Sequence, residues 1–570
     1  MNALMAYFSG NWKRLFSQLM TLMLICVVVF PTAAEQSVTA SKAKEYTCGD
    51  YTYIILDDGT AEIIGYVGLD DELTIPDKLD GLTVTGIADY VFSYMEDSWL
   101  TTVTIPDSVI RMGNNPFAGN EYLKDFIISP DHPFLTVIDG VLFSKPDHRL
   151  ICYPMTLSSD HYSIPDGILA IDGSAFCCNA SLTTVTIPNS VTSIGDEAFT
   201  WCTSLTAISI PENVIFIGEN PFQCCDNLKD ITVSPDNPSI VMIDGVLFSK
   251  PDNRLICYPI TLHFDHYSIP DGTQAIGSAA FICSSLAAIN IPNSVTSIED
   301  RAFYECSSLT ALNIPDSVTS IGDEAFSDCT SLTVITIPDG VTSIGDKVFF
   351  HCDSLTAISI PDSVISIGYS AFSCCNSLTT VNIPDSVTSI GEFAFSDCDS
   401  LTAINIPDNV NKIEFGVFTR CTSLTSIKIP DNVISIEAYA FSGCSSLNDV
   451  NIPRSITSIN DSVFSGCSSL TVINIPYGVI SIEGVAFSGC SSLTAVTIPD
   501  SVTSIGNWAF SECASLTTIT IPDSVIYIGE DAFSCEKSCS RVFIVPADSY
   551  AEQYCKAYEY QYRYPYSSPI

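Results

Sequence analysis

Positive charge is scarce in this chain. Its 570 residues include 22 Lys and Arg against 65 Asp and Glu, which gives a formal net charge of −43. Nucleic acids and anionic membranes both bind proteins through clustered basic side chains. The composition therefore argues against a nucleic-acid partner and against an anionic membrane surface. We interpret the one-signed charge as a means of keeping a long apolar chain in solution.

Catalytic and metal-binding motifs are also lacking. The histidines form no H-E-x-x-H pair, and the chain has no G-x-S-x-G turn. The cysteines lack the clustered spacing of zinc sites. We therefore predict no catalytic residues, no metal and no cofactor, and hence no enzyme. An active site in one of the duplicated segments described below is the weaker alternative.

Only one long apolar run occurs, at Leu19–Phe30, and it follows Lys13 and Arg14. A basic segment, an apolar core and a small-residue end are typical of a secretory signal. The run is shorter than the roughly 18 residues that a membrane span needs. We predict a signal peptide over residues 1–34, cleaved after Ala34, with an uncleaved anchor as the alternative. The expected location is secreted or cell-surface.

Cysteine, by contrast, is abundant and periodic. Proline and phenylalanine recur at the same interval of 23 residues, and such a fixed period is the signature of a solenoid. We interpret the column as a structural ladder of small buried side chains, with disulfides between neighbouring coils as the alternative. Cys535 and Cys539 are the best candidates for a disulfide. The ladder residues are Cys306, Cys329, Cys352, Cys375, Cys398, Cys421, Cys444, Cys467, Cys490 and Cys513.

One unit shows how a coil is built. Leu355, Ile358 and Ile360 follow an L-x-x-I-x-I pattern, which predicts a strand with every second side chain inward. Pro361 ends that strand because it cannot donate to the ladder. A second short extended piece should follow, and then a short helical or irregular segment that places Phe372 in the core.

This unit resembles the BspA-like, or Treponema pallidum-type, leucine-rich repeat family over about residues 70–535. The resemblance implies a mostly β, right-handed and curved solenoid of short strands, turns and short helical segments, capped at both ends. It also implies a surface-exposed or secreted protein that binds a protein or glycoprotein ligand on a host cell or in the matrix. The matching positions are Cys352, Leu355, Ile358, Ile360, Pro361, Val364, Ile367, Ala371 and Phe372.

The repeat is irregular in its first half. Two long segments resemble each other at an offset of 105 residues, and each carries Asp-Gly-Val-Leu-Phe, beginning at Asp139 and Asp244. We interpret both as hairpin-like inserts in an otherwise regular array. The expected order is a linker and N-terminal cap at 35–68, irregular repeats at 69–270 with inserts at 115–154 and 220–259, regular repeats at 271–535, and a C-terminal cap at 536–570.

The outward strand positions of the regular coils are mostly small and neutral-polar, which suits a broad multivalent surface better than a small-molecule pocket. Ordinary strand solvation is the alternative. Lys428, with Arg420 and Arg454 nearby in sequence, predicts a basic patch for an acidic partner. The candidate ligand-binding residues are Thr380, Asn382, Asn405, Ser426, Lys428 and Asn451.

A column of aspartates follows the prolines. Pro-Asp pairs favour turns, so we read the column as turn chemistry, with calcium binding as the alternative. The column comprises Asp316, Asp339, Asp362, Asp385, Asp408 and Asp431.

The function expected from the sequence is protein binding or adhesion by an exported solenoid. A structural scaffold of the cell surface without a specific ligand is the alternative. The sequence leaves the oligomeric state open, and a monomer is the expectation.

Overall fold

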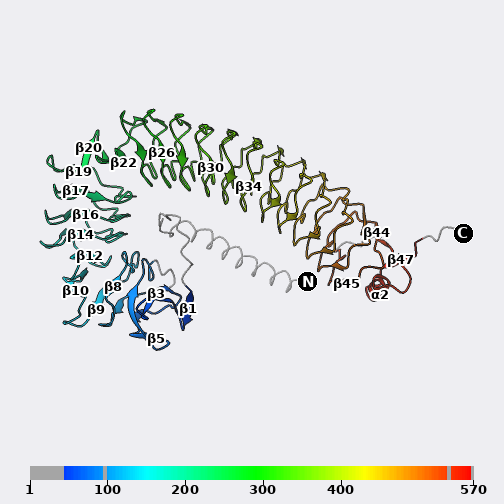
Figure 1. The fold of residues 1–570 in the computed structure, drawn as a ribbon, viewed down its shortest axis with the longest axis horizontal. Coiled ribbons are helices and arrows are strands. Elements are labelled where there is room, and N and C mark those ends of the chain that lie inside the picture. The colour runs from blue at the N-terminus through cyan, green and yellow to red at the C-terminus, as the bar shows by residue number, and fades with distance from the viewer. Residues whose placement is uncertain (1–43, 94–98, 536–540, 566–570) are drawn as a thin grey trace. The chain divides into compact units, whose positions relative to one another are not determined.

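The computed structural model describes residues 44–93, 99–535 and 541–565. The chain divides into two units, residues 1–46 and 47–570, and of the first unit only residues 44–46 are described. The predicted signal peptide therefore lies outside the described residues, as does Cys539. Within the second unit, the coils follow one another in chain order (Figure 1). In the described part of the chain, no helix is both long and apolar enough to cross a membrane.

Each coil has three sides: a first strand, a second strand and a turn segment. Ile358 of the first strand and Ile367 of the second are buried, while their outward neighbours face solvent. The strands pair in parallel and in register with the coils before and after, as Ala357 does with Val334 and Thr380. One coil cannot bury its apolar side alone, so neighbouring coils supply the core. The mostly β solenoid predicted from the sequence is confirmed.

The first strands of successive coils form what we call the strand face. Their bounds are β4 (Glu72–Thr74), β7 (Thr102–Thr104), β9 (Asp125–Ile127), β13 (His161–Ser163), β15 (Thr184–Thr186), β17 (Ala207–Ile210), β19 (Asp230–Val233), β23 (His266–Ser268), β25 (Ala288–Asn290), β27 (Ala311–Asn313), β29 (Val334–Thr336), β31 (Ala357–Ser359), β33 (Thr380–Asn382), β35 (Ala403–Ile404), β37 (Ser426–Ile427), β39 (Asp449–Val450), β42 (Ala495–Thr497), β44 (Thr518–Thr520), β46 (Val542–Ile544) and β47 (Gln561–Arg563).

The second strands are shorter because the chain bends again after two residues. Their bounds are β8 (Arg111–Met112), β14 (Ala170–Ile171), β16 (Ser193–Ile194), β18 (Phe216–Ile217), β24 (Ala275–Ile276), β26 (Ser297–Ile298), β28 (Ser320–Ile321), β30 (Ser343–Ile344), β32 (Ser366–Ile367), β34 (Ser389–Ile390), β36 (Lys412–Ile413), β38 (Ser435–Ile436), β40 (Ser458–Ile459), β41 (Ser481–Ile482), β43 (Ser504–Ile505) and β45 (Tyr527–Ile528).

The third side is a run of turns rather than the short helix that the sequence left open. A typical regular coil has two residues with left-handed φ there, such as Ser370 at 50° and Cys374 at 60°. Between them Ala371 and Phe372 point into the core and are fully buried. Left-handed φ in non-glycine residues is uncommon and interrupts a helix, so the segment turns twice within one coil.

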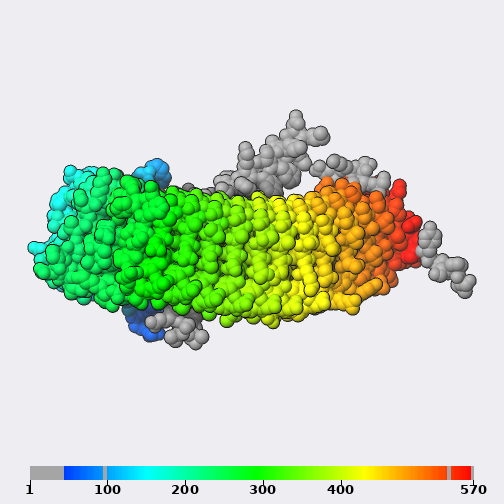
Figure 2. All heavy atoms as spheres, turned by 90° about the horizontal axis from the view of Figure 1, so that it is seen from above, coloured from blue at the N-terminus to red at the C-terminus, as the bar shows by residue number. Residues whose placement is uncertain are grey.

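Stacked phenylalanine rings run through the core. Neighbouring rings from Phe281 to Phe533 lie 5.1–5.9 Å apart between centroids, with ring planes 3–13° apart. Each ring contributes one large apolar surface to both neighbours. The outer surface repeats with the same period, and Figure 2 shows successive coils as parallel rows of atoms.

Both duplicated segments leave the regular path as antiparallel hairpins. Only part of each predicted insert departs from the regular coil. In the first insert, residues 115–127 still form an ordinary turn segment and first strand. The last strand of each hairpin then pairs in parallel with the second strand of the next coil, as Leu150 does with Ile171. The hairpin strands are β10 (Leu135–Ile138), β11 (Val141–Ser144) and β12 (Arg149–Cys152), then β20 (Ile240–Ile243), β21 (Val246–Ser249) and β22 (Arg254–Cys257).

The N-terminal end is a hairpin, as predicted. Its turn contains Gly59, whose φ of 78° suits glycine. One strand of the hairpin pairs in parallel with β6, through Ala61 and Val84, and so covers the first coil. The strands of this region are β1 (Glu45–Cys48), β2 (Tyr51–Ile55), β3 (Ala61–Tyr66), β5 (Lys78–Leu79) and β6 (Leu82–Ile87).

The C-terminal end closes with strand β46 and helix α2 (Tyr550–Ala557), close to the predicted positions. Phe543 and Tyr554 both meet the last ring of the stack, Phe533, edge-on. Arg541 donates hydrogen bonds to the carbonyls of Phe533 and Cys513, and in earlier coils the carbonyl equivalent to that of Phe533 accepts from the next ladder thiol, as Phe487 does from Cys513. The end of the phenylalanine stack is therefore covered by aromatic rings that meet it edge-on rather than face to face.

Candidate functional site

The predicted ligand-binding residues all lie on the strand face and are exposed. Thr380 and Asn382 flank buried Val381 in β33, and Ser426 precedes buried Ile427 in β37. Strand alternation puts the apolar residue inward and its two neighbours outward. An isolated parallel bridge aligns Asn405 with Lys428, and Asn451 occupies the same outward position one coil further on.

A threonine column runs along one edge of the strand face, and the sequence analysis did not single it out. The hydroxyl of Thr333 donates to the carbonyl of Thr310 at 3.0 Å, and most later coils repeat this contact. The repeated Ser-Leu-Thr triplet was the sequence signal. The column includes Thr310, Thr333, Thr356, Thr379, Thr402, Thr425, Thr494 and Thr517.

Asn405 and Lys428 differ in whether their polar side-chain atoms remain available to bind a ligand. The Asn405 side chain donates to the Ile383 carbonyl at 2.7 Å and accepts from the Ile383 amide at 3.0 Å. Its polar atoms therefore already hold two coils together. Across the residues that the structure describes, no carboxylate lies within ion-pair distance of the Lys428 ammonium. The cation is thus free to meet a ligand.

Arg420 and Arg454 belong to other parts of the coil surface. Arg420 lies in the turn segment, where its Nε is 3.1 Å from the Asp397 carboxylate. Arg454 is exposed in the turn that follows the first strand, directly after Pro453. The three cations that lie near one another in the sequence therefore belong to three different parts of the coil, and Lys428 is the one on the strand face.

The cysteine column lies in the core and links neighbouring coils. The Cys375 thiol donates to the Phe349 carbonyl at 3.1 Å, and Cys398 does the same with Phe372 at 3.2 Å. Each thiol is thereby committed to a backbone acceptor of the preceding coil rather than to the next sulfur. Burial raises the pKa of the Cys398 thiol well above its usual range and that of Cys513 to about 12. Such thiols are poor nucleophiles.

Cys535 follows the last ladder position and is disulfide-bonded. Cys539, the partner expected from the sequence, lies outside the described residues.

The histidines do not form a catalytic or metal-binding group. His132 is fully buried, and its ring bonds only backbone atoms. His351 pairs with Asp328 at 2.8 Å on the turn segment. Burial is the largest influence on His132 and lowers its pKa, whereas the bond to Asp328 raises the pKa of His351. The described ranges contain no cluster of three or more His, Cys, Asp or Glu arranged to hold a metal.

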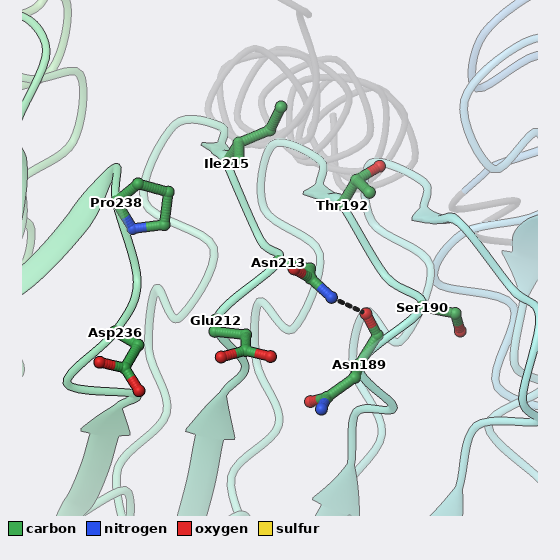
Figure 3. Close-up of a pocket in the computed structure, with 8 residues that line it drawn as sticks. All are labelled: Asn189, Ser190, Thr192, Glu212, Asn213, Ile215, Asp236 and Pro238. Carbon is green, nitrogen blue, oxygen red and sulfur yellow. Dashed lines mark hydrogen bonds between the residues drawn. The ribbon is translucent and has the colours of Figure 1, made fainter.

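A shallow depression of about 600 Å³ lies where the turns after Pro188 and Pro211 meet the second insert (Figure 3). Glu212 and Asp236 direct carboxylates into it, and the Asn213 amide donates to the Asn189 carbonyl at 2.7 Å. Its lining includes carboxylates, amides and hydroxyls but neither a cysteine nor a histidine.

The aspartates that follow the prolines are exposed, each in the turn after a first strand. In that turn the Val364 amide donates to the Pro361 carbonyl at 3.1 Å, and the next coil repeats the bond from Val387 to Pro384. The turn geometry accounts for the Pro-Asp sequence.

The repeats place the chain among known proteins. Six copies of the BspA-type leucine-rich repeat region match within residues 71–151, 152–250, 257–376, 342–471 and 459–557. The chain therefore belongs to the BspA-type leucine-rich repeat family, which confirms the resemblance seen in the sequence. Such repeat arrays generally serve as binding or scaffold proteins, and the match indicates no enzymatic family. No curated protein matches the chain.

Solved structures show similar repeats. The chain is 27% identical to a leucine-rich cell surface protein of Faecalibacterium prausnitzii, over 75% of this chain and 93% of that chain, with a TM-score of 0.33. It is 32% identical to a leucine-rich repeat protein of T. pallidum, over 34% of this chain and 91% of that chain, with a TM-score of 0.29. A leucine-rich repeat protein of Bacteroides ovatus is 22% identical, over 85% and 99%, with a TM-score of 0.30.

Proposed function

We propose that this protein is exported, as a secreted or cell-surface protein, and binds a protein or glycoprotein ligand on a host cell or in the matrix through its strand face, without catalysis. The observation that carries the proposal is the exposure of mostly small side chains on in-register strands over many coils, with a polar column such as Thr336, Ser359 and Asn382 along one edge. Such a surface offers many similar contacts rather than one deep pocket.

The chemistry of the strand face favours a macromolecular partner. Thr380, Asn382 and Ser426 offer hydroxyl and amide groups at fixed intervals, and Lys428 adds one positive charge. Weak contacts repeated along a rigid surface add up to useful affinity when the ligand spans several coils. The net charge of the whole chain is −43, which disfavours the binding of acidic polymers everywhere except near Lys428.

A binding experiment tests the strand face. We would immobilise a panel of matrix proteins and host-cell glycoproteins and measure saturable binding of the purified protein by surface plasmon resonance. Thr380→Glu with Ser426→Glu should weaken binding at least about tenfold, or about 1.4 kcal/mol. Ser320→Glu with Ser389→Glu is the matched control, because these serines are also exposed but lie on second strands β28 and β34.

Equal losses in the two double variants would place the ligand elsewhere or show that added charge alone is responsible. Absence of saturable binding, together with growth of assemblies in light scattering, would favour the scaffold alternative. Export is tested separately by fractionation and N-terminal sequencing, for which we expect the mature chain to begin at Glu35. Full-length protein in the cytoplasm would contradict the proposal.

A further inference from the structure

A second column of side chains lies on the surface of the turn segments. It is formed by the second left-handed residue of each coil, directly before the ladder position. Neighbours in this column touch from coil to coil, as Arg420 touches Asp397 and His351 touches Asp328. The column therefore shows which side chains the stacking brings together outside the core.

Two cysteines are neighbours in this column. The sulfur atoms of Cys224 and Cys283 lie 3.9 Å apart although 59 residues separate them in the sequence. Hairpin β20–β22 leaves and returns between them, so the coil of Cys283 stacks directly on the coil of Cys224. Asn220 in the same turn segment confirms the stacking, because its amide donates to the Ala279 carbonyl at 2.7 Å across the same interval.

We propose that Cys224 and Cys283 form a disulfide that closes the base of the second inserted hairpin. Equivalent positions of adjacent coils are about 5 Å apart, within the Cα range of a disulfide. Rotation of the two side chains closes the remaining gap between the sulfurs. The proposal stands independently of the proposed ligand binding.

The ladder thiols next to this pair do not compete with it for disulfide formation. Cys225 donates to the Phe199 carbonyl at 3.1 Å, and Cys306 donates to the Phe281 carbonyl at 3.1 Å. Cys224 and Cys283, with left-handed φ of 53° and 56°, instead place their sulfurs 3.9 Å apart. Cys224 is buried and Cys283 half-buried, so the pair differs from the ladder thiols in facing a second sulfur rather than in burial alone.

The first inserted hairpin supplies a natural comparison. At an offset of 105 residues, Cys283 corresponds to Cys178, but Cys224 corresponds to Gly119. The stacking itself is preserved, since the Asn115 amide donates to the Ser174 carbonyl at 2.8 Å. The same junction thus occurs twice, and only the second copy holds the pair of thiols.

The reaction requires an oxidant, for which we name a low-molecular-weight disulfide such as oxidised glutathione. The half-buried Cys283 thiolate attacks a glutathione sulfur, and one glutathione thiolate leaves. The Cys224 thiolate then attacks the Cys283 sulfur, so the Cys224–Cys283 bond forms and the second glutathione leaves. Two protein thiols are oxidised, one glutathione disulfide is reduced, and the two thiol protons end on glutathione.

Glu305 lies beside this reaction. The Cys283 thiol donates to its carboxylate at 3.2 Å. The hydrogen bond with Cys224, burial and the Glu305 charge together raise the pKa of Cys283. Since the thiolate is the attacking species, Glu305→Gln should accelerate oxidation at neutral pH several-fold. A purely structural role of Glu305 would not change this rate.

The test uses the purified full chain, reduced and then exposed to oxidised glutathione without denaturant. Peptide mapping by mass spectrometry after alkylation should show a peptide pair joined through Cys224 and Cys283, and no bridge from Cys178 across the first insert. Cys283→Ser should abolish the linked pair. Cys374→Ser is the matched control, because Cys374 lies in the same column between His351 and Asp397.

Formation of the bridge should raise the thermal midpoint and protect hairpin β20–β22 from proteolysis, and reduction should reverse both effects. Folded, oxidised protein in which Cys224 and Cys283 both remain alkylatable would overturn the proposal. So would a map in which Cys283 is joined to a different cysteine. Circular dichroism of the reduced variants separates a lost bridge from a lost fold.

Discussion

His132 is held so that only its neutral form fits. Its Nδ1 accepts hydrogen bonds from the amides of Phe134 and Leu135, at 3.2 and 3.0 Å, so the proton belongs on Nε2, which lies 3.1 Å from the Pro106 carbonyl. Asn237, 105 residues later, makes the equivalent contacts with its side-chain amide. A titrating residue and a non-titrating one thus hold equivalent positions in the two inserts.

Stability should therefore depend on pH through His132. Burial lowers its pKa, against smaller opposing effects of the Pro106 carbonyl and Asp107, and Lys145 adds the smallest effect, a further lowering. A lowered folded pKa means that the unfolded chain binds the proton more readily. The contribution is complete above the unfolded pKa of about 6.5 and is lost as the pH falls through the lower folded value.

His132→Asn should remove this contribution, and at pH 7.5 it should change the free energy of unfolding by less than about 1 kcal/mol, since the amide replaces the same bonds. Urea unfolding at pH 7.5 and 5.0 measures the difference. Asn237→His is the matched control and should add pH dependence. Equal pH dependence in all three proteins would contradict this explanation.

At the scale of single elements, the C-terminal helix α2 is fixed by a reciprocal cap. The Ser549 hydroxyl accepts from the Glu552 amide at 3.1 Å, and the Glu552 carboxylate accepts from the Asp548 amide at 2.7 Å. Two amide groups at the helix start are thereby satisfied. Glu552 also receives bonds from Lys556, Tyr562 and Tyr564, which ties β47 and the chain after it to the helix.

The hydrogen bonds of this helix cap should be lost at low pH. The bonds from Lys556, the Asp548 amide and the two tyrosines lower the pKa of Glu552 to about 2. A lowered folded pKa means that this stabilisation is present above about pH 4.3 and is lost as the pH falls towards 2. Hydrogen exchange of peptides from 541–565 should rise over that range before the exchange of the central coils does. Glu552→Gln should show fast exchange at neutral pH, and Glu559→Gln, exposed beyond the helix, is the control.

The strands could largely be predicted from the sequence, whereas the turn segments could not. Ile358, Pro361 and Phe372 repeat with a period that fixes which side chains point inward. Left-handed φ at Ser370 leaves no such mark, because the same position in neighbouring coils holds residues as different as Lys347 and Phe393. The six proposed binding residues were predicted to be exposed, and they are. That Asn405 is already bonded to the previous coil is visible only once the coils are stacked.

At the scale of the whole molecule, stability is a chain of nearest-neighbour contacts. Each phenylalanine ring meets one ring before it and one after it, and each ladder thiol reaches one coil back. Repeat proteins of this kind unfold according to the strength of individual coils and their interfaces. A defect in one coil therefore weakens its neighbours most.

Phe395→Ala tests this property. Loss of a fully buried ring should cost about 3–5 kcal/mol. Hydrogen exchange should rise in the coils on either side of β34 and change little near β14–β18. Phe393→Ala is the matched control, because this half-buried ring lies on the surface of the same coil and meets Tyr369 and Phe415. A uniform rise along the whole chain would show that the solenoid unfolds as one unit.

The near identity of the coils between Cys306 and Cys513 has a consequence for recognition. A long ligand that covers three coils meets almost the same strand face when it shifts by one coil, a step of about 4.8 Å. It therefore has many near-equivalent registers, and a bound ligand that slides among them keeps part of its translational entropy. Lys428 breaks this degeneracy because it replaces the neutral residue of neighbouring coils. One charged side chain can then fix the position of the ligand on a surface that otherwise binds it equally well at several positions.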